Sequence, residues 1–119
     1  MSSQADEAET EARRGLALAT ELGAQGFHMI TLQLLGDITS RRQPPDTLAA
    51  EAHYRDALAR AAQLNAKPWA AHCHAGLARL YRQLGNPVDF DRHFDIAMAM
   101  YRDLGMTFWL TRAEADRDE

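Results

Sequence analysis

The sequence predicts an all-α domain of about six antiparallel helices, arranged as helical hairpins that repeat about every 40 residues. Composition is the first reason. The chain has 22 alanines and 14 leucines against one valine and three isoleucines, and alanine and leucine favour helices whereas β-branched residues favour strands. Repetition is the second reason. A leucine followed by glycine or asparagine, which is a helix-ending pair, occurs at Leu22, Leu64 and Leu104, at spacings of 64 − 22 = 42 and 104 − 64 = 40 residues.

Length, charge and cysteine content exclude several classes of protein. The chain has 119 residues, enough for one domain, and a formal net charge of −4, which argues against a nucleic-acid-binding surface. The single cysteine, Cys73, excludes an internal disulfide framework. No apolar run approaches the roughly 20 residues of a membrane span, and the acidic N-terminal segment is unlike a signal peptide. We therefore expect a cytoplasmic protein without membrane or nucleic-acid partners.

A stripe of small and apolar residues precedes each helix end, and its steps of 4, 3, 4 and 3 residues place it on one face of a helix. The three stripes are Ala8, Ala12, Gly15, Ala19 and Leu22; Ala50, Tyr54, Ala57, Ala61 and Leu64; and Phe90, Phe94, Ala97, Tyr101 and Leu104. The middle member is glycine or alanine each time. We therefore expect helix backbones to approach closely there, with large side chains of the neighbouring helix filling the space.

The helices are predicted, in order, at residues 4–22, 26–42, 47–64, 68–84, 88–104 and 106–116. An aromatic residue opens every second helix: Phe27, Trp69 and Trp109. Pro44-Pro45 and Gly85-Asn86-Pro87 separate helices, because proline lacks the amide donor that a helix interior requires. Pro68 suits a first turn, and Asp46 or Thr47 is expected to cap the helix after the first break.

These boundaries give a flexible acidic N-terminus at residues 1–7, one helical-repeat domain of about two and a half repeats at residues 8–112, and a polar tail at residues 113–119. In such an array the first and last helices each lack a neighbouring partner. Both ends should then expose apolar residues, and we predict that the chain forms a homodimer through them. One end carries Ala8, Ala12, Leu16 and Ala19, and the other carries Phe108, Trp109 and Leu110.

Two groups of residues follow the order in which the characteristic residues of a known helical repeat occur. They are Leu32, Leu35-Gly36, Ala50, Tyr54 and Ala57 in the first copy, and Gly76-Leu77-Ala78-Arg79-Leu80-Tyr81, Gly85, Phe94 and Ala97 in the second. This order resembles the tetratricopeptide (TPR) repeat. The chain departs from the TPR pattern at Thr39, where an aromatic is usual, at Ala78, where glycine is preferred, and at Phe90, where alanine is preferred. Residues 100–110 also resemble the end of the TPR array in large bacterial signalling ATPases and nucleotide-cyclase-linked regulators.

The TPR resemblance implies a right-handed solenoid of helix pairs whose concave face grips an extended peptide or a helix. It places seven side chains on that face: Ile30, Gln33, Asp37, Arg41, His72, Arg79 and Arg82. Some TPR domains hold a C-terminal carboxylate with a Lys/Asn/Arg clamp. Gln33, Asp37 and Ala75 stand at most of the matching positions here, so we do not expect that clamp. Arg79 and Arg82 suit an acidic ligand, and the alternative is that they are solvated charges paired along the helix.

His72-Cys73-His74 is a cluster of metal-type ligands that we do not expect to bind a metal or cofactor. Histidines two positions apart on a helix point in different directions, and the further ligands that such a site requires are missing. Cys73 aligns with Thr31 on the buried half of its helix, where a thiol packs as a small hydrophobe. The sequence has no phosphate-binding loop, no GxSxG and no catalytic pair of carboxylates at a recognisable spacing. We therefore expect no enzyme activity.

The predicted function is a non-enzymatic protein–protein interaction module, regulatory or scaffolding, that binds a peptide or helix on its concave face, self-associates through its end helices, or does both. Two alternatives stay open: a sensory module that binds a small molecule or short peptide in the groove, and a structural dimerisation piece of a larger regulator. Twelve of the thirteen basic residues are arginine, a composition that suggests a GC-rich bacterial genome. The resemblance of residues 100–110 to the end of the TPR array in bacterial regulators implies a signalling role.

Overall fold

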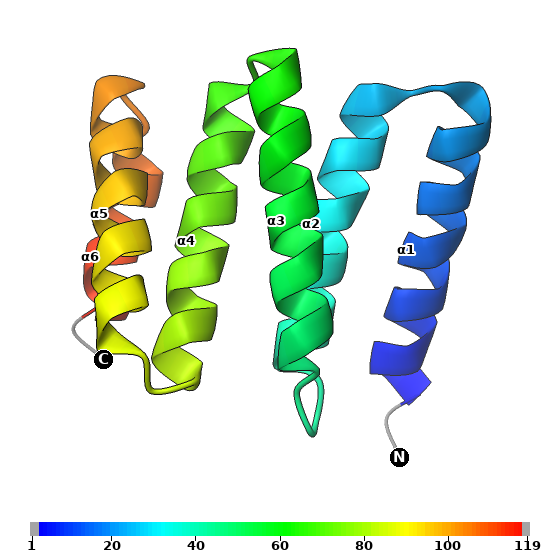
Figure 1. The fold of residues 1–119 in the computed structure, drawn as a ribbon, viewed down its shortest axis with the longest axis horizontal. Coiled ribbons are helices and arrows are strands. Elements are labelled where there is room, and N and C mark those ends of the chain that lie inside the picture. The colour runs from blue at the N-terminus through cyan, green and yellow to red at the C-terminus, as the bar shows by residue number, and fades with distance from the viewer. Residues whose placement is uncertain (1–2, 118–119) are drawn as a thin grey trace.

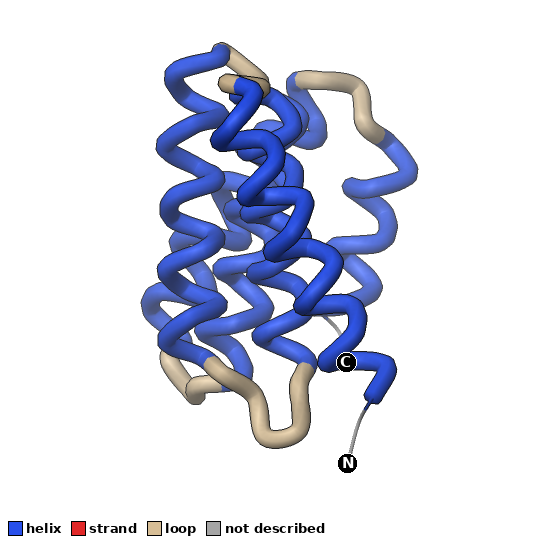
Figure 2. Tube along the Cα trace, turned by 90° about the vertical axis from the view of Figure 1, so that its right-hand side faces the viewer, coloured by secondary structure: helices blue, strands red, loops and turns tan. Residues whose placement is uncertain are grey.

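The computed structural model describes residues 3–117, which form six α-helices joined by short loops (Figure 1). The helices are α1 (Ser3–Leu22), α2 (Gln25–Arg41), α3 (Thr47–Leu64), α4 (Lys67–Gln83), α5 (Pro87–Asp103) and α6 (Thr107–Arg117). Each helix runs antiparallel to the one before it, and the loops lie at the two ends of the molecule (Figure 2). The described residues contain no strand. The all-α prediction is therefore confirmed, with each predicted helix found and its ends shifted by only a few residues.

The predicted helix ends at Leu22, Leu64 and Leu104 are confirmed by the backbone. The next residues, Gly23, Asn65 and Gly105, are left-handed, with φ of 67°, 53° and 70°. In each loop the amide of the following residue donates to a carbonyl five positions back, at 2.8–2.9 Å, which satisfies carbonyls that the helix leaves unpaired. Short polar loops with their own hydrogen bonds thus turn the chain back on itself.

The helix starts also agree with the sequence. The side chain of Asp46 accepts a hydrogen bond from the amide of Ala49 at 3.2 Å, so Asp46 caps α3 as predicted. Pro68 lies in the first turn of α4, where its missing amide costs nothing. Asn86, which the sequence placed only in a helix break, caps α5 by accepting from the amide of Asp89 at 3.2 Å.

Tyr54 of α3 is the residue on which three helices meet. Its side chain is fully buried, and it lies against two glycines, one on each neighbouring helix. A Cβ added to Gly36 of α2 would stand 2.7 Å from the ring, and one added to Gly76 of α4 would stand 2.5 Å from it. The hydroxyl of Tyr54 donates a hydrogen bond to the carboxylate of Asp37 on α2. The ring therefore fills the space that the two glycines leave and fixes α2, α3 and α4 together.

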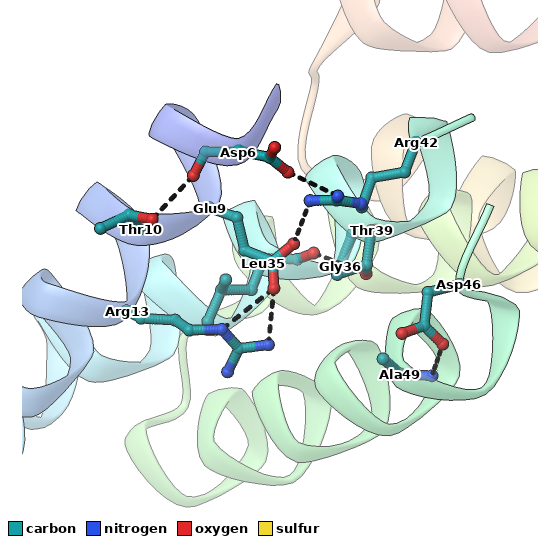
Figure 3. Close-up of polar contacts among 10 residues, drawn as sticks. All are labelled: Asp6, Glu9, Thr10, Arg13, Leu35, Gly36, Thr39, Arg42, Asp46 and Ala49. Carbon is teal, nitrogen blue, oxygen red and sulfur yellow. Dashed lines mark hydrogen bonds and ion pairs between the residues drawn. The ribbon is translucent and has the colours of Figure 1, made fainter. Parts of the chain in front are cut away.

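Arg42, just after α2, ties α1 to the rest of the molecule (Figure 3). Its guanidinium donates to the carboxylate of Asp6 at 2.6 Å and to that of Glu9 at 2.7 Å. Glu9 also accepts from Arg13, and these two cations, Arg13 first, hold the pKa of the Glu9 carboxyl below its usual range. A helix that begins at Ser3 explains why these acidic residues lie near its N-terminus.

The predicted domain limits, residues 8–112, are narrower than the predicted helices at residues 4–22 and 106–116, and the structure agrees with the helices. Residues 3–7, most of which were assigned to a flexible N-terminus, form the first turns of α1. Residues 113–117 were expected in a polar tail, but they belong to α6, where Ala113 packs against the buried side chains of Ala71, Ala97 and Tyr101. Residues 1–2 and 118–119, the remainder of the two predicted tails, lie outside the described residues.

Of the four α1 residues predicted to be exposed, Ala8 is exposed and Leu16 is half-buried, but the prediction is wrong for Ala12 and Ala19. Only 5% of Ala12 and 1% of Ala19 are exposed, because α1 packs on α2. The exposed large apolar side chains of α1 are Leu18 and Leu22. The first helix still has one neighbour, and Ala12 and Ala19 are buried against it.

His74 of α4 and His93 of α5 form a stacked pair that joins their two helices. The ring centroids are 5.2 Å apart and the Nδ1 atoms 3.0 Å apart, so the two rings share one hydrogen bond. Burial first, and then the positive charges of His93, Arg55 and Arg92, lower the pKa of His74 to about 4. Burial also lowers the pKa of His93. Both rings are therefore neutral at neutral pH in the folded protein.

We expect the protein to lose stability as the pH falls from about 7 toward about 5. A histidine in the unfolded chain has a pKa of about 6.5, so in this window the unfolded state binds more protons than the folded state. The free energy of unfolding therefore rises with pH there and falls on acidification. Urea denaturation at constant ionic strength measures it, and His74→Gln should flatten the pH dependence. Equal free energies at the two pH values, or an unchanged slope in the variant, would contradict this expectation.

Candidate binding groove

A groove of about 370 Å³ runs along the face formed by α2, α4 and α6. Figure 1 shows α4 between α2 and α6, so α4 is the floor of the groove and the other two helices are its sides. The lining residues are Gln33, Asp37 and Arg41 of α2; Trp69, His72, Ala75 and Arg79 of α4; Tyr101 of α5; and Trp109, Arg112, Ala113 and Asp116 of α6. Because α2, α4 and α6 run in the same direction, their first turns lie at one end of the groove and their last turns at the other.

The end formed by the first turns of α4 and α6 is aromatic. His72 stands edge-on to both tryptophans, with centroid distances of 5.6 Å to Trp69 and 4.6 Å to Trp109. The Nδ1 atom of His72 shares a hydrogen bond with the hydroxyl of Tyr101 at 2.8 Å. Burial lowers the pKa of His72 and raises that of Tyr101 to about 12. At neutral pH this end of the groove is therefore uncharged and suited to an apolar group.

A fixed carboxylate, Asp37, lies in the middle of the groove. It accepts hydrogen bonds from the hydroxyl of Tyr54 and from Nε2 of Gln33 at 3.1 Å, and Nη2 of Arg79 lies 3.4 Å from its Oδ1. These contacts use side chains of α2, α3 and α4. Because Tyr54 is part of the core, Asp37 and Arg79 are held in place by the same packing that joins the three helices.

Five of the seven side chains predicted on the concave face line this groove: Gln33, Asp37, Arg41, His72 and Arg79. Ile30 of α2 does not line the groove and is partly exposed outside it. Arg82 lies beside a smaller neighbouring pocket and donates a hydrogen bond to the backbone carbonyl of Asp116. Arg82 is thus occupied in holding the end of α6 against α4.

The side chains predicted for self-association lie in three different settings. Leu16 and Leu110 are partly buried against the core of their own chain. Phe108 is 65% exposed and touches only the edge of Trp109 among the aromatic rings described, with their centroids 5.2 Å apart. Trp109 is 39% exposed and lines the groove. Of the four, only Phe108 is a largely exposed apolar side chain outside the groove.

Several lining residues were missed in the sequence prediction, although the last helix was predicted at residues 106–116 and found at Thr107–Arg117. Arg112 was given no role, and Ala113 and Asp116 were assigned to the polar tail. Trp69 was predicted only to open a helix. The repeat itself indicates their place, since 109 − 69 = 40 and 112 − 72 = 40, so Trp109 and Arg112 of α6 stand at the positions of Trp69 and His72 of α4.

The cluster His72-Cys73-His74 is divided by its helix. His72 lines the groove, Cys73 is fully buried, and His74 contacts His93 of α5. Burial raises the pKa of the Cys73 thiol to about 12, which keeps it protonated and unreactive at neutral pH. Among residues 3–117 no three histidine, cysteine, aspartate or glutamate side chains form a group able to hold a metal ion.

The described chain is therefore an all-α protein with one mixed aromatic and arginine-lined groove. None of its helices is both long enough and apolar enough to cross a membrane. Compared with protein-family models, with curated proteins and with solved structures, the chain matches none of them.

Proposed function

We propose that this protein is a non-enzymatic interaction module of TPR-like helical repeats, which binds a peptide or a helix of a partner in the groove of α2, α4 and α6. The observation that carries the proposal is the meeting of residues far apart in sequence. Side chains near positions 33–41, 69–79 and 109–116 line one groove. The TPR resemblance placed five of these side chains on a common binding face: Gln33, Asp37, Arg41, His72 and Arg79.

The form of the groove favours a ligand that lies along the helices. One end offers Trp69 and Trp109 for an apolar group, while the middle and the other end offer arginine and aspartate side chains. Apolar anchors flanked by a few fixed polar groups are typical of binding sites. The volume of about 370 Å³ also admits a small molecule, so a sensory module for a small ligand is the alternative. A regulatory or scaffolding role in the cytoplasm belongs to the same proposal.

A variant in which a side chain fills the groove tests the proposal. Peptides are selected from a random library on the wild-type protein, and isothermal titration calorimetry measures their affinity for the wild type and for Ala75→Phe, which places a ring on the groove floor. Ala59→Phe, the same change at an exposed position of α3 outside the groove, is the matched control. We expect at least a roughly tenfold loss of affinity, about 1.4 kcal/mol, for Ala75→Phe and none for Ala59→Phe. Equal affinity for all three proteins would refute the proposal.

Self-association is a second candidate function, favoured by the exposure of Phe108 on α6 and of Leu18 and Leu22 on α1. These side chains lie on the two end helices of the chain, and exposed apolar ends of a repeat array are places where a second copy can stack. Sedimentation equilibrium is expected to show a dimer that Phe108→Ser weakens. A monomer at every concentration would exclude this candidate and leave the groove proposal unaffected.

A further inference from the structure

The groove carries positive charge in an otherwise acidic protein. The whole chain has a formal net charge of −4. The groove is lined by three arginines (Arg41, Arg79 and Arg112) and two aspartates (Asp37 and Asp116), which gives 3 − 2 = +1. His72 adds no charge at neutral pH, because burial lowers its pKa. A surface whose sign is opposite to that of the whole molecule attracts ligands of negative charge.

Arg41 and Arg112 are the two cations of the groove that have no partner. Arg79 is paired with Asp37 at 3.4 Å, whereas Arg41 and Arg112 make no ion pair or side-chain hydrogen bond within residues 3–117. A guanidinium with all its donors free binds a carboxylate in a two-pronged manner. Both free arginines therefore offer the same chemistry to a ligand.

The two arginines are placed differently with respect to the aromatic end. Arg112 follows Trp109 by one turn of α6, whereas Arg41 is in the last turn of α2, at the far end of the groove. The lining residues of α4 run from Trp69 to Arg79, which is about 15 Å along the helix at 1.5 Å per residue. An extended peptide covers that length with about four or five residues.

We propose that the occupant of the groove is an acidic peptide segment of a partner protein, with one bulky apolar side chain against Trp69 and Trp109 and carboxylates bound by Arg112 and Arg41. This inference rests on the proposed function and adds the chemistry of the ligand to it. The carboxylates come from glutamate or aspartate side chains or from the C-terminus of the partner, and peptides with free and amidated C-termini distinguish the two sources.

The electrostatic part is tested without any ligand, because the only two tryptophans of the chain, Trp69 and Trp109, both line the groove. Iodide is an anionic quencher and acrylamide a neutral one. Iodide should quench the fluorescence of the two tryptophans more strongly than their accessibility to acrylamide predicts. Arg112→Gln should reduce quenching by iodide and leave quenching by acrylamide unchanged. Arg60→Gln, on α3 and paired with Asp56 outside the groove, is the matched control. Unchanged iodide quenching in Arg112→Gln would overturn the assignment of positive potential.

The ligand class is tested with three capped model peptides, in which one leucine is flanked by glutamates, by glutamines or by lysines. Their binding to the protein is measured by tryptophan fluorescence at low ionic strength. We expect the glutamate peptide to bind about tenfold more tightly than the glutamine peptide and the lysine peptide to bind most weakly. Arg41→Gln combined with Arg112→Gln should abolish this preference, whereas Arg60→Gln should keep it. Replacing the leucine by alanine should weaken all three peptides.

The failure of this inference and the failure of the proposed function give different results. Equal binding of the three peptides, an unaltered preference in the double variant, or no binding of any of them would overturn the acidic ligand. The proposed function would still stand if library-selected peptides lost affinity for Ala75→Phe. If library-selected peptides bound Ala75→Phe as well as wild type, the groove itself would be the wrong site.

Discussion

Replacing Tyr54 by alanine is expected to lower the free energy of unfolding by about 4 kcal/mol, a typical cost of removing a buried aromatic ring. The ring of Tyr54 is fully buried and fills the space between Gly36 of α2 and Gly76 of α4. Neither glycine has a side chain that can move into the cavity, and the three helices are held apart by their other contacts. The variant should therefore keep most of the cavity. Chemical denaturation followed by circular dichroism measures the loss.

Tyr54→Phe separates the ring from its hydroxyl. The hydroxyl donates to Asp37, which also accepts from Gln33 and faces Arg79. Asp37 keeps these other partners in Tyr54→Phe, so the expected loss is about 1 kcal/mol. If Tyr54→Ala cost no more than Tyr54→Phe, the ring would not be packed between the two glycines as described.

Replacing Gly76 by alanine is expected to lower the free energy of unfolding by about 2 kcal/mol, the usual range for overpacking a core. Alanine favours helices over glycine by about 1 kcal/mol, so the direction of this effect is opposite to that of helix propensity. The new Cβ would stand 2.5 Å from Cε1 of Tyr54. That ring also lies against Gly36 of α2, so it has little room to move.

Gly26→Ala is the matched control, since Gly26 lies in α2 and a Cβ there meets no atom within 4 Å. It should leave the stability unchanged or raise it by up to about 1 kcal/mol. Gly36→Ala should destabilise in the same direction as Gly76→Ala, because its Cβ would stand 2.7 Å from the ring of Tyr54. A stabilising effect at Gly76 would show that α4 does not approach α3 this closely.

The sequence was sufficient to predict the helices because it marks their ends chemically. Leucine–glycine and leucine–asparagine pairs, Asp46 and Pro68 each act locally, through a left-handed backbone, a cap or a missing amide. The packing partners were harder to predict. The stripe that contains Tyr54 was recognised, but nothing local indicates that its ring contacts Gly36 and Gly76 on two different helices.

The groove was predicted only in part, because local sequence does not show which side chains of different helices come together. The concave-face positions on α2 and α4 came from the resemblance to the TPR repeat, and five of those seven side chains line the groove. The last helix was predicted at residues 106–116, but the contribution of α6 to the groove was missed because the domain limits assigned its second half, with Ala113 and Asp116, to a polar tail. None of the residues of α6 is fully buried, so its sequence carries little of the apolar periodicity on which such predictions depend.

The most direct test of the account is hydrogen exchange of the full chain, followed by mass spectrometry, with and without a library-selected peptide. We predict that the peptide slows exchange in three separate segments, near residues 33–41, 69–79 and 109–116, which line the groove together. Slower exchange confined to α1 and α5, or limited to the surroundings of Leu18, Leu22 and Phe108 on the end helices, would contradict the claim that the face of α2, α4 and α6 is the binding site.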